Sequence, residues 1–184
     1  MAYYVMTCEG PYPIKPIAIT PDIEISWTSG EPVAFEDGST LVYVLDDDHD
    51  GDPLAMYQGA CPVMRHDLVE ALTSAGVDNI QYLPAVLEDR QRGIRHAKYK
   101  ACNIVGGVAC ADMEKSDLVE TAEAGLGDMN FRNLVLDESK MRGLLLFRLA
   151  EKLDVVVVSE RVRQTIERRQ VAGMVFYGPG EWPG

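Results

Sequence analysis

The stretch from Val155 to Tyr177 limits the possible folds of this chain more than any other part of the sequence. It begins with four consecutive valines, Val155–Val158, which favour a short buried strand. Ser159 follows, and serine is a residue that often caps the N-terminus of a helix. An apolar stripe then recurs at helical spacing, at Val158, Val162 and Ile166. The stretch ends in a second apolar run, Met174–Tyr177. We therefore predict a strand–helix–strand unit that carries no chemistry of its own.

The same pattern occurs earlier in the chain. A shift of 94 positions lays Met64–Leu83 over Val158–Tyr177 without a gap, and the apolar positions coincide. Any two amphipathic helices that each precede a strand would match about as well, so a chance match stays open as the alternative. If the match is a true repeat, it predicts a pseudo-symmetric pair of helices on one sheet, because two copies are too few for a solenoid.

The remaining patterns indicate an α+β fold with a mixed, mainly antiparallel sheet and two principal amphipathic helices. The first helix is expected from Pro62 to Ala75, and Gly76 ends it. The polar stretch Glu88–Lys98 reads as an exposed connection, and Arg148–Lys152 as one helical turn. Other strands are expected at Tyr3–Thr7, Ile23–Trp27, Glu31–Phe35, Leu41–Leu45, Ile80–Leu87, Tyr99–Ala111 (with a bulge or close backbone approach at Gly106-Gly107), Leu134–Leu136 and Leu144–Phe147.

Length and charge restrict the class of protein. The 184 residues are expected to form a single domain, 1–184, with a strand-rich part over 1–55 and an irregular Gly/Pro-rich tail over 179–184. A content of 47% hydrophobic and 25% charged residues excludes a disordered chain. The 29 acidic and 17 basic residues give a formal charge of −12. This charge disfavours binding to nucleic acid or to an anionic membrane and favours a basic partner, although it also serves solubility.

The cysteines and the ends of the chain indicate a cytoplasmic protein. No two of Cys8, Cys61, Cys102 and Cys110 have C-x-x-C spacing, so we expect reduced thiols in the core. The first residues, MAYYVMTCEG, lack the features of a signal peptide, and no apolar run is long enough to span a bilayer.

The acidic cluster from Asp46 to Asp52 is the most suggestive polar feature. Asp46, Asp48, Asp50 and Gly51 match positions 1, 3, 5 and 6 of a calcium loop, but position 12 is Tyr57, so the cluster is not an EF-hand. A looser calcium site, a solvated loop and a docking patch for a basic partner all stay open. The candidate partner-binding residues are Asp46, Asp47, Asp48, Asp50 and Asp52.

No other residues form a pattern typical of catalysis, of a cofactor site or of a metal site. His49, His66 and His96 lie far apart and do not have zinc-ligand spacing. The region around Asn103 and Gly106-Gly107 lacks the phosphate-binding glycine motifs, but it is where a small-molecule site would lie if the protein were an enzyme. The basic cluster Arg90, Arg92, Arg95, Lys98 and Lys100 reads as a surface feature.

Two segments resemble one protein family. Tyr99–Ser116 is similar to a family motif in which a strand carrying an Asn leads to a D-x-x-x-S turn, here Asn103, Asp112 and Ser116. Leu146–Arg161 is similar to the family's Phe-Arg-Leu turn, apolar strand and Ser-Glu helix start. Both segments resemble an immunity-protein family found beside bacterial polymorphic toxins, and the resemblance covers residues 56–178.

The resemblance implies a non-catalytic protein that binds a cognate toxin and needs no cofactor. It also implies structural roles for the matching residues: Ser159 caps a helix, Phe147 packs, and Asp112 and Ser116 shape a turn. Two alternatives from other classes stay open: an enzyme or small-molecule-binding protein, and a calcium-dependent binding module centred on the acidic cluster.

Overall fold

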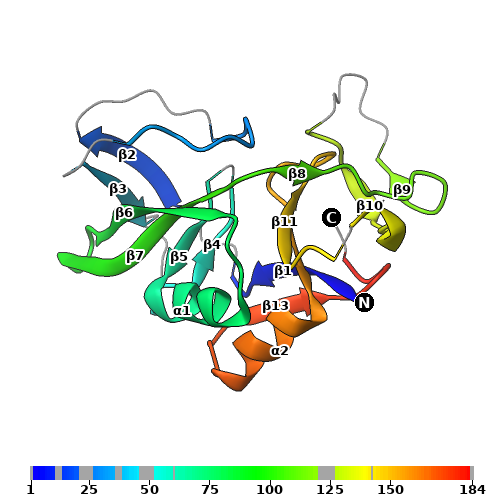
Figure 1. Cartoon of the computed structure of the whole chain (residues 1–184). Coiled ribbons are helices and arrows are strands. Elements are labelled where there is room, and N and C mark those ends of the chain that lie inside the picture. Colours follow the sequence, from blue (N-terminus) through cyan, green and yellow to red (C-terminus); the bar gives the residue numbers. More distant parts are fainter. Residues whose placement is uncertain are drawn as a thin grey trace.

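The computed structural model describes residues 2–10, 14–20 (main chain only), 27–35, 39–45, 52–59, 61–119, 127–141 and 143–182 (Figure 1). Asp46, Asp47, Asp48 and Asp50, as well as residues 23–26 of a predicted strand, lie outside these ranges. Two main sheets and two helices make up the described fold, with mostly antiparallel strand pairs. The predicted α+β class is confirmed.

The first main sheet has the strand order β13-β1-β12-β11-β8. Its only parallel pair joins β11 to β8. The strands, in sheet order, are Met174–Tyr177, Tyr3–Cys8, Val156–Ser159, Leu146–Leu149 and Gly107–Val108.

The second main sheet has the order β2-β3-β6-β7-β5-β4, and only β3 and β6 are parallel. Its strands, in sheet order, are Ile14–Thr20, Thr40–Leu45, Ile80–Asp89, Ile94–Ile104, Val63–Arg65 and Met56–Tyr57. The remaining elements are α1 (His66–Ala75), α2 (Glu160–Arg168), the strand pair β9 (Asp117–Leu118) and β10 (Phe131–Asn133), and the 3-10 turn η1 (Glu138–Lys140).

Two strand–helix–strand units have the same internal register. Unit one is β5-α1-β6 with β7 between its strands, and unit two is β12-α2-β13 with β1 between its strands. Met64 pairs with Lys100 and Ile80 with Ile104, just as Val158 pairs with Tyr4 and Met174 with Cys8. The outer strands therefore correspond at the shift of 94 positions, and the repeat suggested by the sequence is present. The units belong to two sheets, however, and not to the one sheet that was expected.

The helices of both units end in the same way. Gly76 and Gln170 occupy equivalent positions, and both have left-handed backbone conformations, with φ of 93° and 55°. The next residue closes the same hydrogen bond in each unit, from Val77 N–H to Leu72 O and from Val171 N–H to Ile166 O. This pattern is a Schellman motif, which satisfies the last carbonyls of a helix. The predicted helix end at Gly76 is confirmed.

The core consists of three clusters, and the four valines contribute to two of them. Val156 and Val158 point into a central cluster, which also holds apolar residues of both helices and both sheets. Val155 and Val157 point into a second cluster on the opposite face of the first sheet. A third cluster covers the outer face of the second sheet. All four valines are therefore buried, and burial of each such side chain stabilises the fold by about 1.5–3 kcal/mol.

Several expected elements differ from the observed ones. Residues 31–35 are not a strand, and the antiparallel neighbour of β3 is β2, which was not among the expected strands. Pro16 lies at a shift in the β2–β3 register on an edge strand, where a missing N–H is tolerated. The first helix begins at His66, because Val63–Arg65 pairs with β7 as strand β5.

Differences also occur around β11. Arg148 and Leu149 belong to this strand and not to a helical turn. The expected strand at 134–136 is displaced to β10, and Leu136 forms only an isolated bridge with Ala111. Ser159 holds the N-cap position of α2, but its buried hydroxyl makes no capping bond, so its predicted capping role is wrong.

Other predicted structural roles are confirmed. The Asp112 carbonyl accepts from Ser116 N–H at 2.8 Å, and the Ser116 hydroxyl bonds to the Val135 main chain, so both residues shape a turn. Phe147 is buried and packs against Tyr3 with 6.0 Å between ring centroids. Gly106 has φ of 84°, and its N–H donates to Gly30 O at 2.8 Å, which is the close backbone approach predicted there.

Candidate partner-binding surface

The β6–β7 hairpin carries the most distinctive polar surface of the described chain. Instead of an exposed connection over Glu88–Lys98, both strands continue to the Asp89–Ile94 pair and leave only a short turn. Asp89 is buried and accepts from Arg92 N–H at 3.0 Å, and Gly93 supplies the left-handed residue of the turn. The hairpin extends past the core, as Figure 1 shows. Along the mostly exposed first residues of β7, main-chain pairing with β6 holds the hairpin together.

The hairpin tip presents an apolar side chain among arginines. Ile94 is 45% exposed, and Met113 and Leu144 are exposed to a similar extent elsewhere in the described chain. Arg90 and Arg95 both lie 3.8 Å from Glu88 carboxylate oxygens, on the surface. Exposed ion pairs of this kind contribute roughly 0–1 kcal/mol, so a partner can replace them at little cost. Arginine is enriched in protein–protein interfaces.

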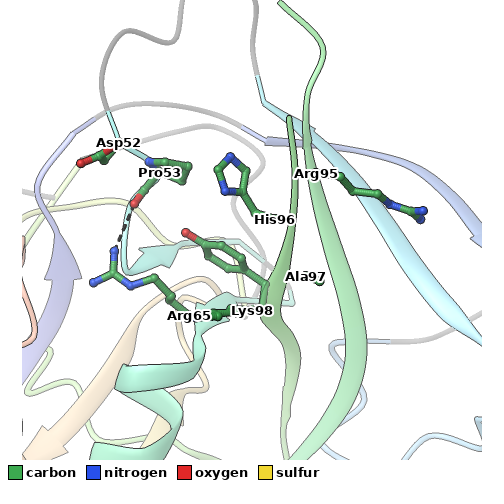
Figure 2. A pocket seen from close by; sticks show the side chains of 8 residues that line it. Asp52, Pro53, Arg65, Arg95, His96, Ala97 and Lys98 are labelled. Carbon is green, nitrogen blue, oxygen red and sulfur yellow. Dashed lines mark hydrogen bonds between the residues drawn. The ribbon is translucent and has the colours of Figure 1, made fainter. Parts of the chain in front are cut away.

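A shallow pocket of about 550 Å³ lies at the base of this hairpin. Figure 2 shows the hairpin residues His96 and Lys98 on one side of it and Asp52 and Pro53 on the other. Arg95 extends across the hairpin, away from Asp52. The described residues that line the pocket are Asp52, Pro53, Arg65, Arg95, His96, Ala97, Lys98 and Tyr99.

Arg65 fixes one wall of the pocket. Its guanidinium donates twice to the Asp67 carboxylate, at 2.9 and 2.7 Å, and once to Pro53 O at 3.2 Å. Partial burial acts to raise the pKa of Asp67, but hydrogen bonds and charge from Arg65 outweigh it and hold this pKa below its usual value. The bidentate pair therefore stays ionised at neutral pH and locks Arg65 in place.

Two tyrosines hold the pocket floor. The Tyr99 hydroxyl donates to Leu54 O at 2.8 Å, and the Tyr57 hydroxyl accepts from Leu54 N–H at 3.1 Å. Burial raises the pKa of Tyr57 to about 12 and raises that of Tyr99 as well, so both hydroxyls keep their protons. Leu54 is thus fixed on both sides, and Asp52 leaves this anchored segment at the pocket rim. Tyr57, the residue at calcium position 12, is buried in β4.

The pocket brings together an acidic and a basic residue, Asp52 and Lys98, that lie far apart in the sequence. Asp52 is exposed, and it is the one candidate partner-binding residue within the described ranges. Lys98 is also exposed and forms no ion pair with any residue that the structure describes. His96 Nε2 is buried and has no hydrogen-bond partner in the described part of the chain. Such a surface suits a protein partner that carries both acidic and basic side chains.

Asn103 and Gly107, which belong to the region suggested for a small-molecule site, do not line this pocket. No three His, Cys, Asp or Glu side chains within the described ranges are grouped to hold a metal ion. Asn103 is fully buried, and its amide donates to Glu31 O and to Gln81 Oε1, so it serves the packing of the sheet. Gly107 lines a separate hollow of about 590 Å³ whose described lining has Lys140 as its single charged residue.

The sequence signal for the hairpin is weak for a physical reason. The first five residues of β7 are mostly exposed, so they show no alternation of apolar and polar side chains. The turn residue Gly93, preceded by three polar residues, was the one local hint of a hairpin. Of the helices that the structure describes, neither is long and apolar enough to cross a membrane.

Comparison with protein families identifies a match. A model of the immunity protein family Imm11 matches residues 16–180 of the chain. This range contains all of unit one and, apart from β1, all of unit two. It also contains both segments whose motifs resemble an immunity-protein family. No curated protein matches the chain.

Proposed function

Because the chain belongs to the Imm11 immunity protein family, we propose that it binds a cognate bacterial toxin and neutralises it without catalysing a reaction. The family match over residues 16–180 is the observation that carries this proposal. The protein would act in the cytoplasm of the cell that produces the toxin, by covering the toxin's active face. Its specificity would then reside in surface side chains and not in a catalytic centre.

The net charge supports a basic toxin as the partner. A formal charge of −12 attracts a positively charged protein over distances beyond direct contact. Charge complementarity of this kind raises the association rate and selects among partners more than it raises affinity. It also disfavours nucleic acid and anionic membranes as competing partners.

We assign the toxin-contacting surface to the β6–β7 hairpin and the acidic segment that ends at Asp52. The exposed Ile94 is the apolar anchor of this surface, and Lys98 is its cation without an ion pair in the described ranges. The candidate residues Asp46, Asp47, Asp48 and Asp50 precede Asp52 in the chain and add negative charge to the same segment. Acidic and basic contacts side by side fix the register of a partner better than one sign of charge alone.

Co-expression tests the proposed function. We expect the adjacent gene to encode a secreted protein with a C-terminal toxin domain, and cells that make this domain should survive only when they also make the present chain. The two proteins should purify as a complex. If cells die at the same rate with and without the chain, and no complex forms, the proposal is wrong.

Neutralising the acidic segment should slow association. With all five candidate aspartates changed to Asn, we expect the association rate constant with an inactive toxin to fall about 10-fold at low salt and its salt dependence to flatten. Stopped-flow mixing across ionic strengths measures both quantities. The control removes five acidic side chains elsewhere: Glu31, Asp78, Glu114, Asp128 and Asp154. Equal slowing in the two variants would show that only net charge matters.

A further inference from the structure

The outer edge of β13 is an unpaired strand edge. β13 is the end strand of its sheet, and β1 is its one strand partner. No hydrogen bond joins the outer side of Met174–Tyr177 to any residue in the described part of the chain. An open edge of this kind is a template for pairing with another chain. Figure 1 shows β13 at the margin of the sheet beside α2.

The ladder with β1 identifies which main-chain groups point outward. Glu9 N–H donates to Gly173 O at 2.6 Å, so these two residues form a hydrogen-bonded pair. Such pairs alternate along an antiparallel ladder, so Val175 and Tyr177 also direct their polar groups toward β1. The N–H and C=O groups of Met174 and Phe176 therefore point away from the sheet.

In unit one, the outer edge of the equivalent strand, β6, is covered by another strand. Val105 N–H donates to Asn79 O, the bond equivalent to that between Glu9 and Gly173. Next along β6, the Gln81 side-chain amide binds both main-chain groups of Val33, at 2.9 and 2.8 Å. The segment around Val33 lies over a face of the sheet, because the Asn103 amide of the neighbouring strand also binds it, at Glu31 O. The outer edge of β6 is covered by β3, which pairs with it from Ala85 to Glu88, just beyond the repeated residues. No described strand pairs with the outer edge of β13 in unit two.

The side chains of β13 do not protect its edge. All four residues, Met174 to Tyr177, are half-buried, and none is charged or proline. Soluble proteins usually blunt an open edge with Lys, Pro or a bulge. Met174 and Phe176 pack partly against the central cluster, and Tyr177 packs against the cluster on the other face. A strand added here would extend both apolar faces of the sheet.

We propose that β13 is a docking edge for an extended segment of the toxin, which adds to the sheet by main-chain hydrogen bonds. This inference rests on the proposed function. The precedent in unit one is β3, which pairs with the outer edge of β6 just beyond the repeated residues. Four residues span about 13 Å, too little to hold a stable dimer of this chain by themselves. The matching segment has apolar side chains at consecutive positions, because successive side chains alternate between the two faces that it must continue.

Amide hydrogen exchange tests this edge directly. The probe is the inactive toxin domain encoded by the adjacent gene, bound to the isotope-labelled full chain. We expect the Met174 and Phe176 amides to exchange freely in the unbound protein and at least about 10-fold more slowly in the complex. The Val175 and Tyr177 amides, which point toward β1, serve as internal references and should change less.

A side-chain variant gives an independent readout. Val175 belongs to none of the three core clusters, so Val175→Lys should fold while opposing strand addition. We expect it to weaken toxin binding at least about 10-fold, whereas Thr28→Lys, at another exposed site, should bind within about threefold of the unchanged protein.

The possible outcomes separate the two proposals. If the toxin complex forms but the Met174 and Phe176 amides keep their free exchange rates, strand addition is wrong and the proposed function stands. Protection of these amides in the free protein that grows with its concentration would instead mean pairing with a second copy, and the toxin-docking edge is then wrong. If no complex forms at all, the proposed function fails and this inference fails with it.

Discussion

Unit one and unit two share a register, a helix packing and a helix end, but the chain takes a different course at the end of each unit. β6 continues beyond Leu83 to Asp89, and there it pairs with β3 and forms the hairpin with β7. β13 ends at Tyr177, and Gly178, Pro179 and Gly180 turn the chain away. The strand that follows the helix is thus longer in unit one than in unit two.

This difference separates the frame from the surface that we assign to binding. Everything the units share lies in or around the central cluster, where both helices meet. Ile94 and the pocket residues from Arg95 to Tyr99 belong to the hairpin that extends unit one, and Asp52 lies across the pocket from them. We infer that the repeated part supplies stability. The added part supplies side chains that recognise the toxin. The unpaired edge of β13 in unit two supplies main-chain hydrogen bonds that depend little on the sequence of the toxin segment.

The largest expected effect tests whether the units contribute equally to stability. Leu72 and Ile166 are equivalent and fully buried in the central cluster. Leu72→Ala and Ile166→Ala should each lower the free energy of unfolding by about 2–5 kcal/mol, through lost burial and the cavity left behind. Urea denaturation measures both. A loss below about 1 kcal/mol for either one would break the equivalence of the two units.

A smaller effect comes from the left-handed residue at each helix end. Gly76→Ala should lower the free energy of unfolding by about 1–2 kcal/mol, because a side chain is strained at a φ of 93°. The reciprocal change, Gln170→Gly, should raise the free energy of unfolding by up to about 1 kcal/mol, since it removes the same strain from unit two. Thermal denaturation detects the opposite signs. Destabilisation by both changes would mean that the Gln170 side chain contributes more than its backbone costs.

The smallest expected effect concerns Glu160, which is equivalent to His66 of unit one. Hydrogen bonds from Arg163 and then Tyr4 lower the pKa of Glu160 to about 2, well below its ordinary value of 4.5. A lowered folded-state pKa stabilises the fold above about pH 4.5, and this contribution is lost as the pH falls toward 2. Glu160→Gln should therefore slightly lower the urea midpoint at pH 7 and leave it unchanged near pH 2. A constant difference across this range would contradict the linkage.

The sequence predicts the two repeated units well, because the packing of apolar side chains determines them. The valine run, the helical stripe and the 94-residue shift all follow from burial, and each is found in the structure. Ser159 is instructive: its type predicts a cap, but the strand before the helix turns its hydroxyl into the core. Local preference gives way there to the sheet register.

The sequence predicts the binding surface poorly for the opposite reason. Polar residues of β7 are held by main-chain pairing with β6, which leaves no pattern in residue type. Asp52 and Lys98 are 46 positions apart, and only the fold brings them to one pocket. Ile94 looks ordinary in sequence, and its exposure becomes visible only when the hairpin extends past the core.

Calorimetric titration with the inactive toxin tests the central claim most directly, that the unit-one extension carries recognition. The hairpin variant is Ile94→Ser with Arg95→Ser, and the matched control is Gln164→Ser with Arg168→Ser on the exposed face of α2. We predict that the hairpin variant raises Kd by about 30-fold or more, as loss of an interface anchor does, and that the control stays within about threefold. Equal Kd values for the hairpin variant and the unchanged protein would contradict the claim.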